Sequence, residues 1–224
     1  MSPPPGSVHV VQDVASAFAE VVLDTFATRP DPRFVVVLSG GPTARHCYEK
    51  LAEVGAAAID WASVDVLLGD ERCVAADDPD ANQRLVREAL LERVPPVGSF
   101  HPMSCGDVVS YQRMLEEMPA LDLVHLGLGP DGHTASLFPG SPALDPSPGT
   151  LAIRSSDPNE RNPHERMTLT FEAIARARLV VFTVSGDSKR DTLRALEAGA
   201  DLPAARVRAA RVLWLVDHLA ATEA

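Results

Sequence analysis

One histidine stands apart from the other six because it lies among glycines and small polar residues. His133 follows Asp131 by two positions, inside the run from Gly127 to Ser136. An imidazole with a pKa of about 6.5 can take up and return a proton at neutral pH. Asp131 is close enough in sequence to orient this ring or to support its charge. The pattern predicts a general base, and a turn histidine with a purely structural hydrogen bond is the alternative.

A glycine-rich turn is the second unusual feature of the sequence. The run from Ser39 to Thr43 places Gly40 and Gly41 directly before a predicted helix. Glycine lets a chain bend tightly and approach a ligand closely, and the free N–H groups at a helix N-terminus favour an anion. The turn matches neither a Walker loop nor the G-x-G-x-x-G fingerprint, so a nucleotide is not implied. A plain strand–helix turn capped by Thr43 is the alternative.

Two cations lie at comparable positions after strands. Lys189 falls in the first turn of a predicted helix, and Arg72 follows a predicted strand. A cation is poorly placed near a helix N-terminus, and an anionic ligand would compensate for it. Both side chains could hold a phosphate group by charge-assisted hydrogen bonds. The alternative for each residue is a solvated surface cation.

Composition and spacing exclude several other classes of function. Asp and Glu number 31 against 20 Lys and Arg, and the net charge of −11 argues against binding to nucleic acid or to an anionic membrane surface. The remaining histidines lack the spacing of metal ligands, so we expect no zinc site. No G-x-S-x-G motif supplies a serine nucleophile.

The three cysteines are an odd number and are widely spaced. Cys47, Cys73 and Cys105 fit neither a disulfide framework nor a C-x-x-C metal site. We therefore expect three inert thiols in a reduced cytosol. A reactive Cys73 beside Arg72 is the alternative.

The elements that must position these residues follow an alternating pattern. Short apolar runs predict strands over 34–38, 64–68, 121–126, 179–184 and 212–216, and apolar periodicity predicts helices over about 12–28, 42–54, 81–94, 107–118 and 187–198. This alternation predicts an α/β fold, an open and mostly parallel sheet with helices on both faces, in a Rossmann-like three-layer sandwich. The polar segments that follow the strands would then meet at the carboxyl edge of the sheet, where open α/β folds bind ligands.

The chain reads as one domain over residues 9–224, preceded by a Pro-rich disordered tail over 1–8. The stretch 141–165 is rich in Pro, Ser, Asp and Asn, and it is either an insertion or a mobile lid. A further short strand is expected over 167–170. The start of the sequence is not typical of a signal peptide, and no apolar run is long enough to span a bilayer.

These segments together resemble the family that 6-phosphogluconolactonases share with glucosamine-6-phosphate isomerases/deaminases. The resemblance spans roughly residues 34 to 217. It rests on Ser39-Gly-Gly-Pro-Thr43, Gly69-Asp-Glu-Arg-Cys-Val74 with Asn82, Asp131-Gly-His-Thr-Ala-Ser-Leu-Phe-Pro-Gly140, Arg166-Met-Thr-Leu-Thr170 and Gly186-Asp-Ser-Lys189. Phe138 stands where the deaminases carry a glutamate used in ring opening, and Arg72 stands where they carry a tyrosine. Phenylalanine cannot transfer a proton, so the resemblance favours the lactonase branch.

The resemblance implies an enzyme that hydrolyses 6-phosphoglucono-δ-lactone to 6-phosphogluconate, the second step of the oxidative pentose phosphate pathway. His133 would act as the base with Asp131 in support, and the backbone at Gly40, Gly41 or Gly132 would stabilise the oxyanion. The phosphate would be held by Gly41, Thr43, Arg72 and Lys189, with Arg166 as a weaker phosphate or hydroxyl contact. Asp70 would bind a sugar hydroxyl or hold Arg72.

Ester hydrolysis involves no redox step, so we expect no metal and no organic cofactor. We further expect a cytoplasmic monomer or weak homodimer whose partner is the small-molecule sugar-phosphate lactone alone, with no nucleic acid or membrane. Two other functions stay open at this point. They are glucosamine-6-phosphate isomerisation/deamination and non-catalytic binding of a sugar phosphate.

Overall fold

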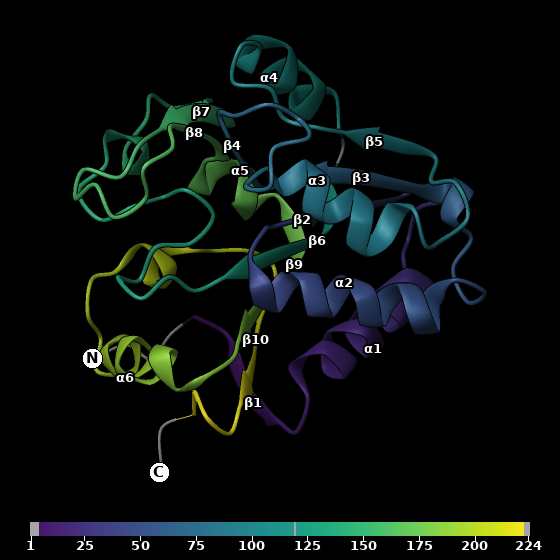
Figure 1. Cartoon of the computed structure of the whole chain (residues 1–224), viewed down its shortest axis with the longest axis horizontal. Helices are drawn as coiled ribbons and strands as arrows, with labels where there is room; N and C mark the ends of the chain where they lie inside the picture. The colour runs from purple at the N-terminus through teal and green to yellow at the C-terminus, as the bar shows by residue number, and fades with distance from the viewer. Residues whose placement is uncertain (1–4, 119, 222–224) are drawn as a thin grey trace.

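The computed structural model describes residues 5–118 and 120–221. Its centre is a parallel sheet of seven strands in the order β1-β10-β9-β6-β2-β3-β5. The strands are β1 (Ser7–Val11), β2 (Phe34–Leu38), β3 (Val64–Leu68), β5 (Ser99–His101), β6 (Leu121–Gly127), β9 (Ala177–Val184) and β10 (Val212–Asp217). The expected fold class, an open parallel sheet flanked by helices, is confirmed (Figure 1).

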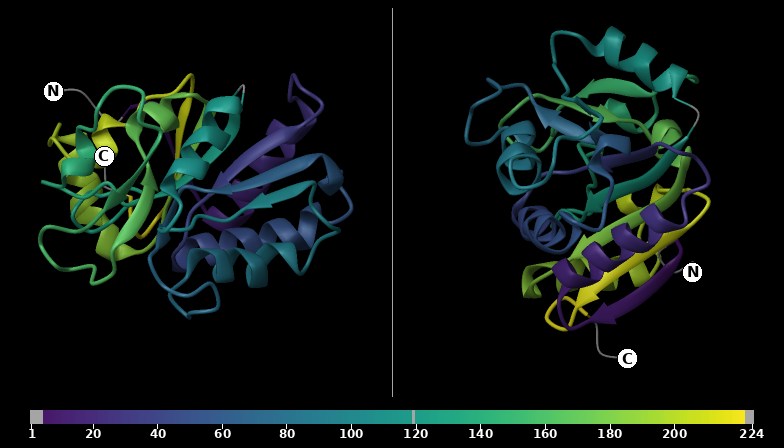
Figure 2. Two further views of the ribbon diagram at one scale, coloured as in Figure 1. Left: turned by 90° about the horizontal axis from the view of Figure 1, so that it is seen from above. Right: turned by 90° about the vertical axis from the view of Figure 1, so that its right-hand side faces the viewer.

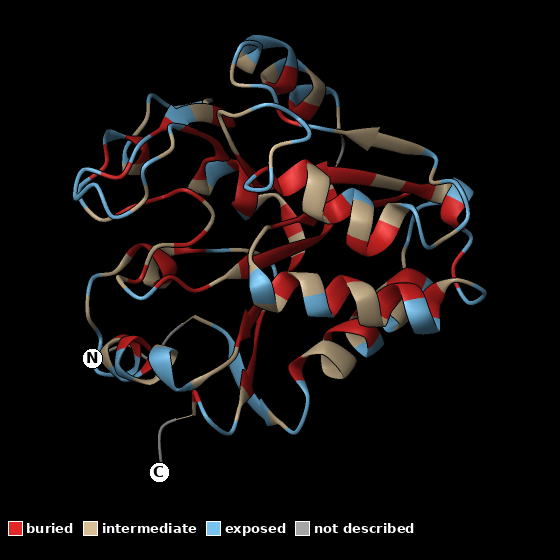
Figure 3. Ribbon diagram, viewed as in Figure 1, coloured by how far each residue is buried: buried red, intermediate tan, exposed pale blue. Residues whose placement is uncertain are grey.

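The central strands form because their side chains are apolar on both faces. All five residues of β2 are buried, and β6 is buried from Leu121 to Leu126. A strand covered on both faces gains stability from every side chain, which favours a continuous apolar run over an alternating one. Figure 3 shows this buried band running through the middle of the molecule.

Helices cover the sheet. They are α1 (Val14–Ala27), α2 (Pro42–Gly55), α3 (Asn82–Val86), α4 (Val108–Glu117), α5 (Phe171–Ala175) and α6 (Arg190–Glu197). The left view of Figure 2 shows α2 and α3 to one side of the strands β2 and β3, and α4 to the other. The single helix expected over 81–94 is instead α3 followed by a π-helical turn over Arg87–Leu91. Lys189 closes a 3₁₀ turn, Asp187–Lys189, directly before α6.

A second, antiparallel sheet of three strands lies beside the carboxyl edge of the main one. Its order is β4 (Asp70–Arg72), β8 (Arg166–Leu169) and β7 (Ala152–Ser155). The strand expected over 167–170 is therefore present as β8, whereas β7 falls inside the segment expected to be an insertion or a lid. The register pairs Arg72 with Arg166 and Asp70 with Thr168. This pairing brings two predicted site segments together.

The expected tail over residues 1–8 is too long by at least two residues. Residues 1–4 lie outside the described part of the chain, but Ser7 and Val8 belong to β1 and pair with Leu213 and Trp214 of β10. Because β1 is an edge strand and mostly exposed, it lacks the buried apolar run by which the inner strands were recognised.

The expectation of three inert thiols is wrong. Cys73 and Cys105 form a disulfide with a Cα–Cα distance of 5.4 Å, and Cys47 is a buried free thiol. The two bonded cysteines are 32 positions apart in sequence, and only the pairing of the fold brings them together. In the described ranges, no helix is both long and apolar enough to cross a membrane.

Candidate active site

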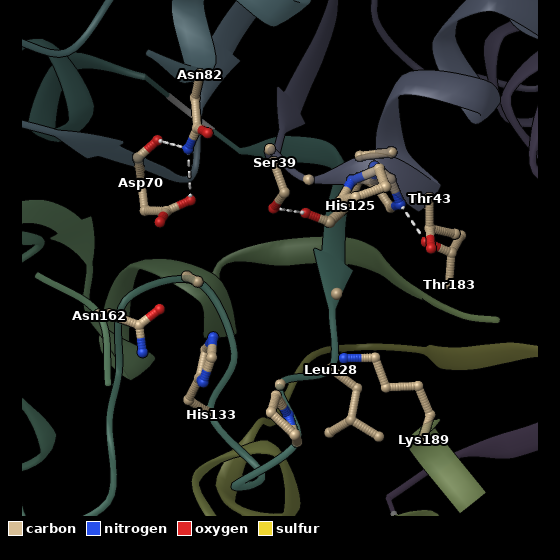
Figure 4. Close-up of a pocket in the computed structure, with 18 of the residues that line it drawn as sticks. Ser39, Thr43, Asp70, Asn82, His125, Leu128, His133, Asn162, Thr183 and Lys189 are labelled. Carbon is tan, nitrogen blue, oxygen red and sulfur yellow. Dashed lines mark hydrogen bonds between the residues drawn. The ribbon is translucent and has the colours of Figure 1, made fainter. Parts of the chain in front are cut away.

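A cavity of about 450 Å³ opens at the carboxyl edge of the sheet. Its lining comes from the segments that follow β2, β3, β6 and β9, together with β8 and the loop that contains Asn162. The predicted site residues that line it are Gly40, Gly41, Thr43, Asp70, Arg72, His133, Arg166 and Lys189. Asp131 lies behind His133 and not in the lining. The sheet topology therefore gathers the residues in one place, as expected (Figure 4).

His133 and Asp131 form a close pair. The Nδ1 atom of His133 lies 2.5 Å from Oδ1 of Asp131, which also accepts the backbone N–H of His133 at 3.1 Å. The side chain of Asp131 is only 6% exposed. Burial opposes the charge of this carboxylate, but the hydrogen bond and the positive charge of His133 outweigh burial and lower the pKa of Asp131 to about 2. With Nδ1 engaged, Nε2 is the imidazole nitrogen left for chemistry in the cavity.

The loop around His133 is built to hold the imidazole ring. Phe138 is fully buried, and its ring centroid lies 4.8 Å from that of the imidazole. On another side, a Cβ atom at Gly129 would come within 2.1 Å of Nδ1 of His133, so only glycine allows this close approach. The N–H of Gly129 donates to the carbonyl of His133 at 2.8 Å. These contacts restrain the ring on two sides.

Asp70 anchors a buried polar network at the base of the cavity. Its carboxylate accepts hydrogen bonds from Ser136 Oγ at 2.6 Å and from Asn82 Nδ2 at 3.1 Å, and it lies 3.8 Å from Nη1 of Arg166. We expected Asp70 either to bind a sugar hydroxyl or to hold Arg72. Its contacts among the described residues do not support the second role. The ion pair forms with Arg166, because β8 places that residue deeper in the site.

Arg72 and Arg166 put two guanidinium groups at one corner of the cavity. Arg166 is 7% exposed, and burial lowers its pKa while the charge of Asp70 opposes that shift. Arg72 donates from Nη1 to the carbonyl of Asp80. The Nε atoms of both arginines are buried without a hydrogen-bond partner among the described residues. Two adjacent cations with unused donors favour an anionic ligand.

The glycine turn and Lys189 form the other cationic part of the site. Gly41 has a φ of +103°, a conformation that favours glycine, and it precedes Pro42 at the start of α2. A Cβ atom at Gly40 would come within 1.8 Å of Asn82 Oδ1, so the turn is tied closely to α3. Burial lowers the pKa of Lys189, and the nearby carboxylate of Asp131 opposes the shift. This arrangement offers an ammonium group and a helix N-terminus to an anion.

Several contributors were not found from the sequence. Glu71 is buried and accepts the backbone N–H groups of Arg72, Asn82 and Gln83, each at 2.7 Å. Burial raises its pKa, and these three hydrogen bonds oppose the shift. Glu71 thereby fixes the end of β4 against the start of α3. Asn162, from the loop after β7, also reaches the lining. Neither role has a local sequence signal, because both depend on segments that meet only in the fold.

The fold and the site together define an α/β protein in which one cavity holds three cationic side chains and a histidine–aspartate pair. Over residues 5–214 the chain matches the family described as glucosamine-6-phosphate isomerases/6-phosphogluconolactonase, and it belongs to that family.

Relatives and solved structures agree with this assignment. A 6-phosphogluconolactonase of Synechocystis sp. is 39% identical over 205 residues, which cover 83% of this chain and 82% of the relative. A 6-phosphogluconolactonase of Mycobacterium tuberculosis is 36% identical over 84% of each chain. The crystal structure of 6-phosphogluconolactonase from Leishmania guyanensis is similar with a TM-score of 0.84 and 28% identity, over 98% of both chains.

Proposed function

We propose that the protein hydrolyses 6-phosphoglucono-δ-lactone to 6-phosphogluconate, as the second step of the oxidative pentose phosphate pathway. The observation that carries this proposal is the cavity in which His133, held by Asp131, faces the same space as Arg72, Arg166 and Lys189. Hydrolysis of a phosphorylated cyclic ester requires a base and an anion anchor in one pocket. The lactonase relatives provide the independent support.

The reaction begins with a water molecule that attacks C1 of the lactone. Nε2 of His133 takes the proton of this water as the new C–O bond forms, and Asp131 stabilises the resulting imidazolium. When the intermediate collapses, the bond from C1 to the ring oxygen breaks, and the imidazolium returns the proton to that oxygen. The base is then restored, and the ring has opened to the acid.

The oxyanion that develops at C1 needs hydrogen-bond donors. The N–H group of Gly40 is the donor we propose, because Gly40 lines the cavity and Gly41 is assigned to the phosphate. Gly132, the third candidate from the sequence, is a poor choice. Its N–H already donates to the carbonyl of Gly129 at 3.0 Å, and the residue is absent from the lining.

Binding of the phosphate group positions the substrate in the cavity. We assign it to Lys189, Gly41 and Thr43, with Arg72 as a further contact. Arg166 is a weaker contact to a phosphate or hydroxyl group. Binding energy from a phosphate remote from C1 can hold the ester in its reactive geometry.

Deamination of glucosamine 6-phosphate is disfavoured by Phe138. This side chain is fully buried beside His133, at the position where the deaminases carry the carboxylate used in ring opening. A hydrocarbon ring has no proton to transfer.

We propose an active monomer or weak homodimer, since residues of this chain supply both the histidine–aspartate pair and the cations of the cavity. We propose a cytoplasmic location on the strength of the proposed reaction. The cysteine argument no longer supports it, because Cys73 and Cys105 form a disulfide and disulfides are rare in a reduced cytosol.

A pH-stat assay with freshly generated lactone tests the function. Acid release should exceed the spontaneous rate in proportion to protein concentration, whereas glucosamine 6-phosphate should yield no ammonia. An acid-release rate equal to the spontaneous one would refute the proposal, and ammonia release would favour the deaminase instead.

A further inference from the structure

A buried hydrogen-bond network lies directly behind the glycine turn. His125, on β6, is fully buried. Its Nδ1 atom lies 2.8 Å from the hydroxyl of Tyr48. Its Nε2 atom lies 2.8 Å from the hydroxyl of Thr183, and Figure 4 shows this contact between His125 and Thr183. Thr183 in turn lines the cavity, together with Thr43 and Lys189. The imidazole therefore connects the turn to a hydroxyl at the proposed anion site.

The proton on the Tyr48 hydroxyl decides how the network is arranged. This hydroxyl accepts the N–H of Ser39 at 2.8 Å, and it lies within 2.8 Å of both the Ser39 carbonyl and Nδ1 of His125. A hydroxyl carries only one proton, so it donates either to the carbonyl or to the imidazole. Burial lowers the pKa of His125 to about 3, and the ring accordingly carries a single proton at neutral pH.

In the first arrangement, Tyr48 donates to the carbonyl of Ser39, and Nδ1–H of His125 donates to Tyr48. Nε2 then accepts the proton of Thr183, so the threonine presents only lone pairs to the cavity. Every group in the network has a partner. This arrangement suits an empty cavity and repels an anion.

In the second arrangement, Tyr48 donates to Nδ1, and Nε2–H donates to Thr183. The hydroxyl proton of Thr183 is then free to point into the cavity. The carbonyl of Ser39 loses one hydrogen bond, and an anion that accepts from Thr183 compensates for the loss. The thiol of Cys47 is protonated, because burial raises its pKa to about 12. It contacts Thr183 and can donate weakly to the same oxygen in either arrangement.

We propose that His125 is a positioning residue that changes tautomer when a phosphate group binds, and thereby turns the Thr183 hydroxyl into a donor to that group. Nδ1 gives up its proton and Nε2 takes one by exchange with solvent, so no net proton is gained or lost. This proposal rests on the proposed function, in which Lys189, Gly41 and Thr43 bind the phosphate group. It adds two residues, His125 and Thr183, to which the sequence assigned no part in binding.

The histidine tautomer can be measured directly. Protein labelled with ¹⁵N in its histidine rings is titrated with inorganic phosphate, and two-bond ¹H–¹⁵N correlations report which nitrogen of His125 carries the proton. We expect Nδ1–H without phosphate and Nε2–H at saturation. An unchanged tautomer at saturation would overturn the inference, as would the absence of any phosphate binding.

A substitution separates positioning from a merely structural role. Thr183→Val keeps the shape of the side chain and removes its hydroxyl. It should hold His125 in the Nδ1–H form at every phosphate concentration and raise KM for the phosphorylated lactone roughly tenfold, with kcat little changed. Turnover of glucono-δ-lactone, which lacks the phosphate, should stay the same. Thr25→Val on α1 is the matched control, since its hydroxyl donates to the carbonyl of Val21. A Thr183→Val protein that still switches tautomer would overturn the inference.

The two proposals fail in distinguishable ways. A tautomer change in a protein that does not hydrolyse the lactone would refute the function and keep the phosphate-linked network. Hydrolysis without a tautomer change would keep the function and refute the network.

Discussion

At the scale of single residues, the site depends on side chains that are held by a neighbour at one atom and keep another atom for the substrate. Asp131 occupies Nδ1 of His133 and leaves Nε2 to the cavity. Asp70 pairs with Arg166, Ser136 and Asn82 and so fixes the buried guanidinium. Lys189 is partly desolvated, which lowers its pKa and leaves its ammonium group poorly hydrated. We expect an anionic substrate to compensate for this loss of hydration.

Lys189→Ala tests the phosphate anchor. We expect KM for the phosphorylated lactone to rise by roughly 10- to 100-fold, because a charge-assisted hydrogen bond to a phosphate contributes about 1.5–3 kcal/mol. The KM for glucono-δ-lactone should not change. Steady-state kinetics on both substrates provide the measurement, and Lys50→Ala, which removes a lysine that pairs with Glu53, is the control. An unchanged KM for the phosphorylated substrate would show that the anchor is wrongly assigned.

The site residues that could be predicted from the sequence are those with a signal in their immediate sequence context. His133 and Asp131 are two positions apart, and Gly40, Gly41 and Lys189 lie within five positions of the end of a strand. The partner of Arg166 could not be predicted in the same way, because it depends on the register of β8 against β4. No role in the site was assigned to His125 from its sequence context. Its hydrogen bond to Thr183 depends on two strands meeting in the fold.

At the scale of elements, the parallel sheet aligns the carboxyl ends of its strands and so assembles the cavity. The strands 34–38 and 64–68 were predicted at their observed bounds, because they are short apolar runs bounded by polar residues. The strands β4 and β7 were missed. They have three and four residues, and their stability comes from pairing with β8 and not from an apolar pattern of their own.

Gly129→Ala tests how tightly the loop after β6 holds the imidazole. The added methyl carbon would lie 2.1 Å from Nδ1 of His133, so the ring must move away from Asp131. We expect kcat to fall by about 10²-fold or more, with the far-UV circular dichroism spectrum unchanged. Gly69→Ala is the matched control, since its nearest neighbour would lie at an ordinary 3.5 Å. Equal activity in the two variants would contradict this account of the loop.

At the scale of the whole molecule, a chain with a net charge of −11 concentrates cations at one edge of its sheet. Arg72, Arg166 and Lys189 share one cavity, in which Asp70 is the only acidic side chain of the described lining. The disulfide between Cys73 and Cys105 joins this region to the segment before α4. Cys73 directly follows Arg72, so the covalent link also restrains the end of β4.

The disulfide predicts a specific thiol count. Protein unfolded in denaturant without reductant should expose one titratable thiol, that of Cys47, and three after reduction. Cys105→Ser should lower the free energy of unfolding by roughly 2–4 kcal/mol, because the open chain gains entropy when it unfolds. Reduced wild-type protein is the control and should match the variant. Three thiols before reduction would show that the link does not form.

We propose that His133 acts as the base in a cavity whose cations hold the phosphate. The turnover number of His133→Asn with freshly generated 6-phosphoglucono-δ-lactone, corrected for spontaneous opening, tests it most directly. We expect kcat to fall by roughly 10²- to 10⁴-fold, with binding of 6-phosphogluconate unchanged. A variant that turns over at nearly the wild-type rate would contradict the account.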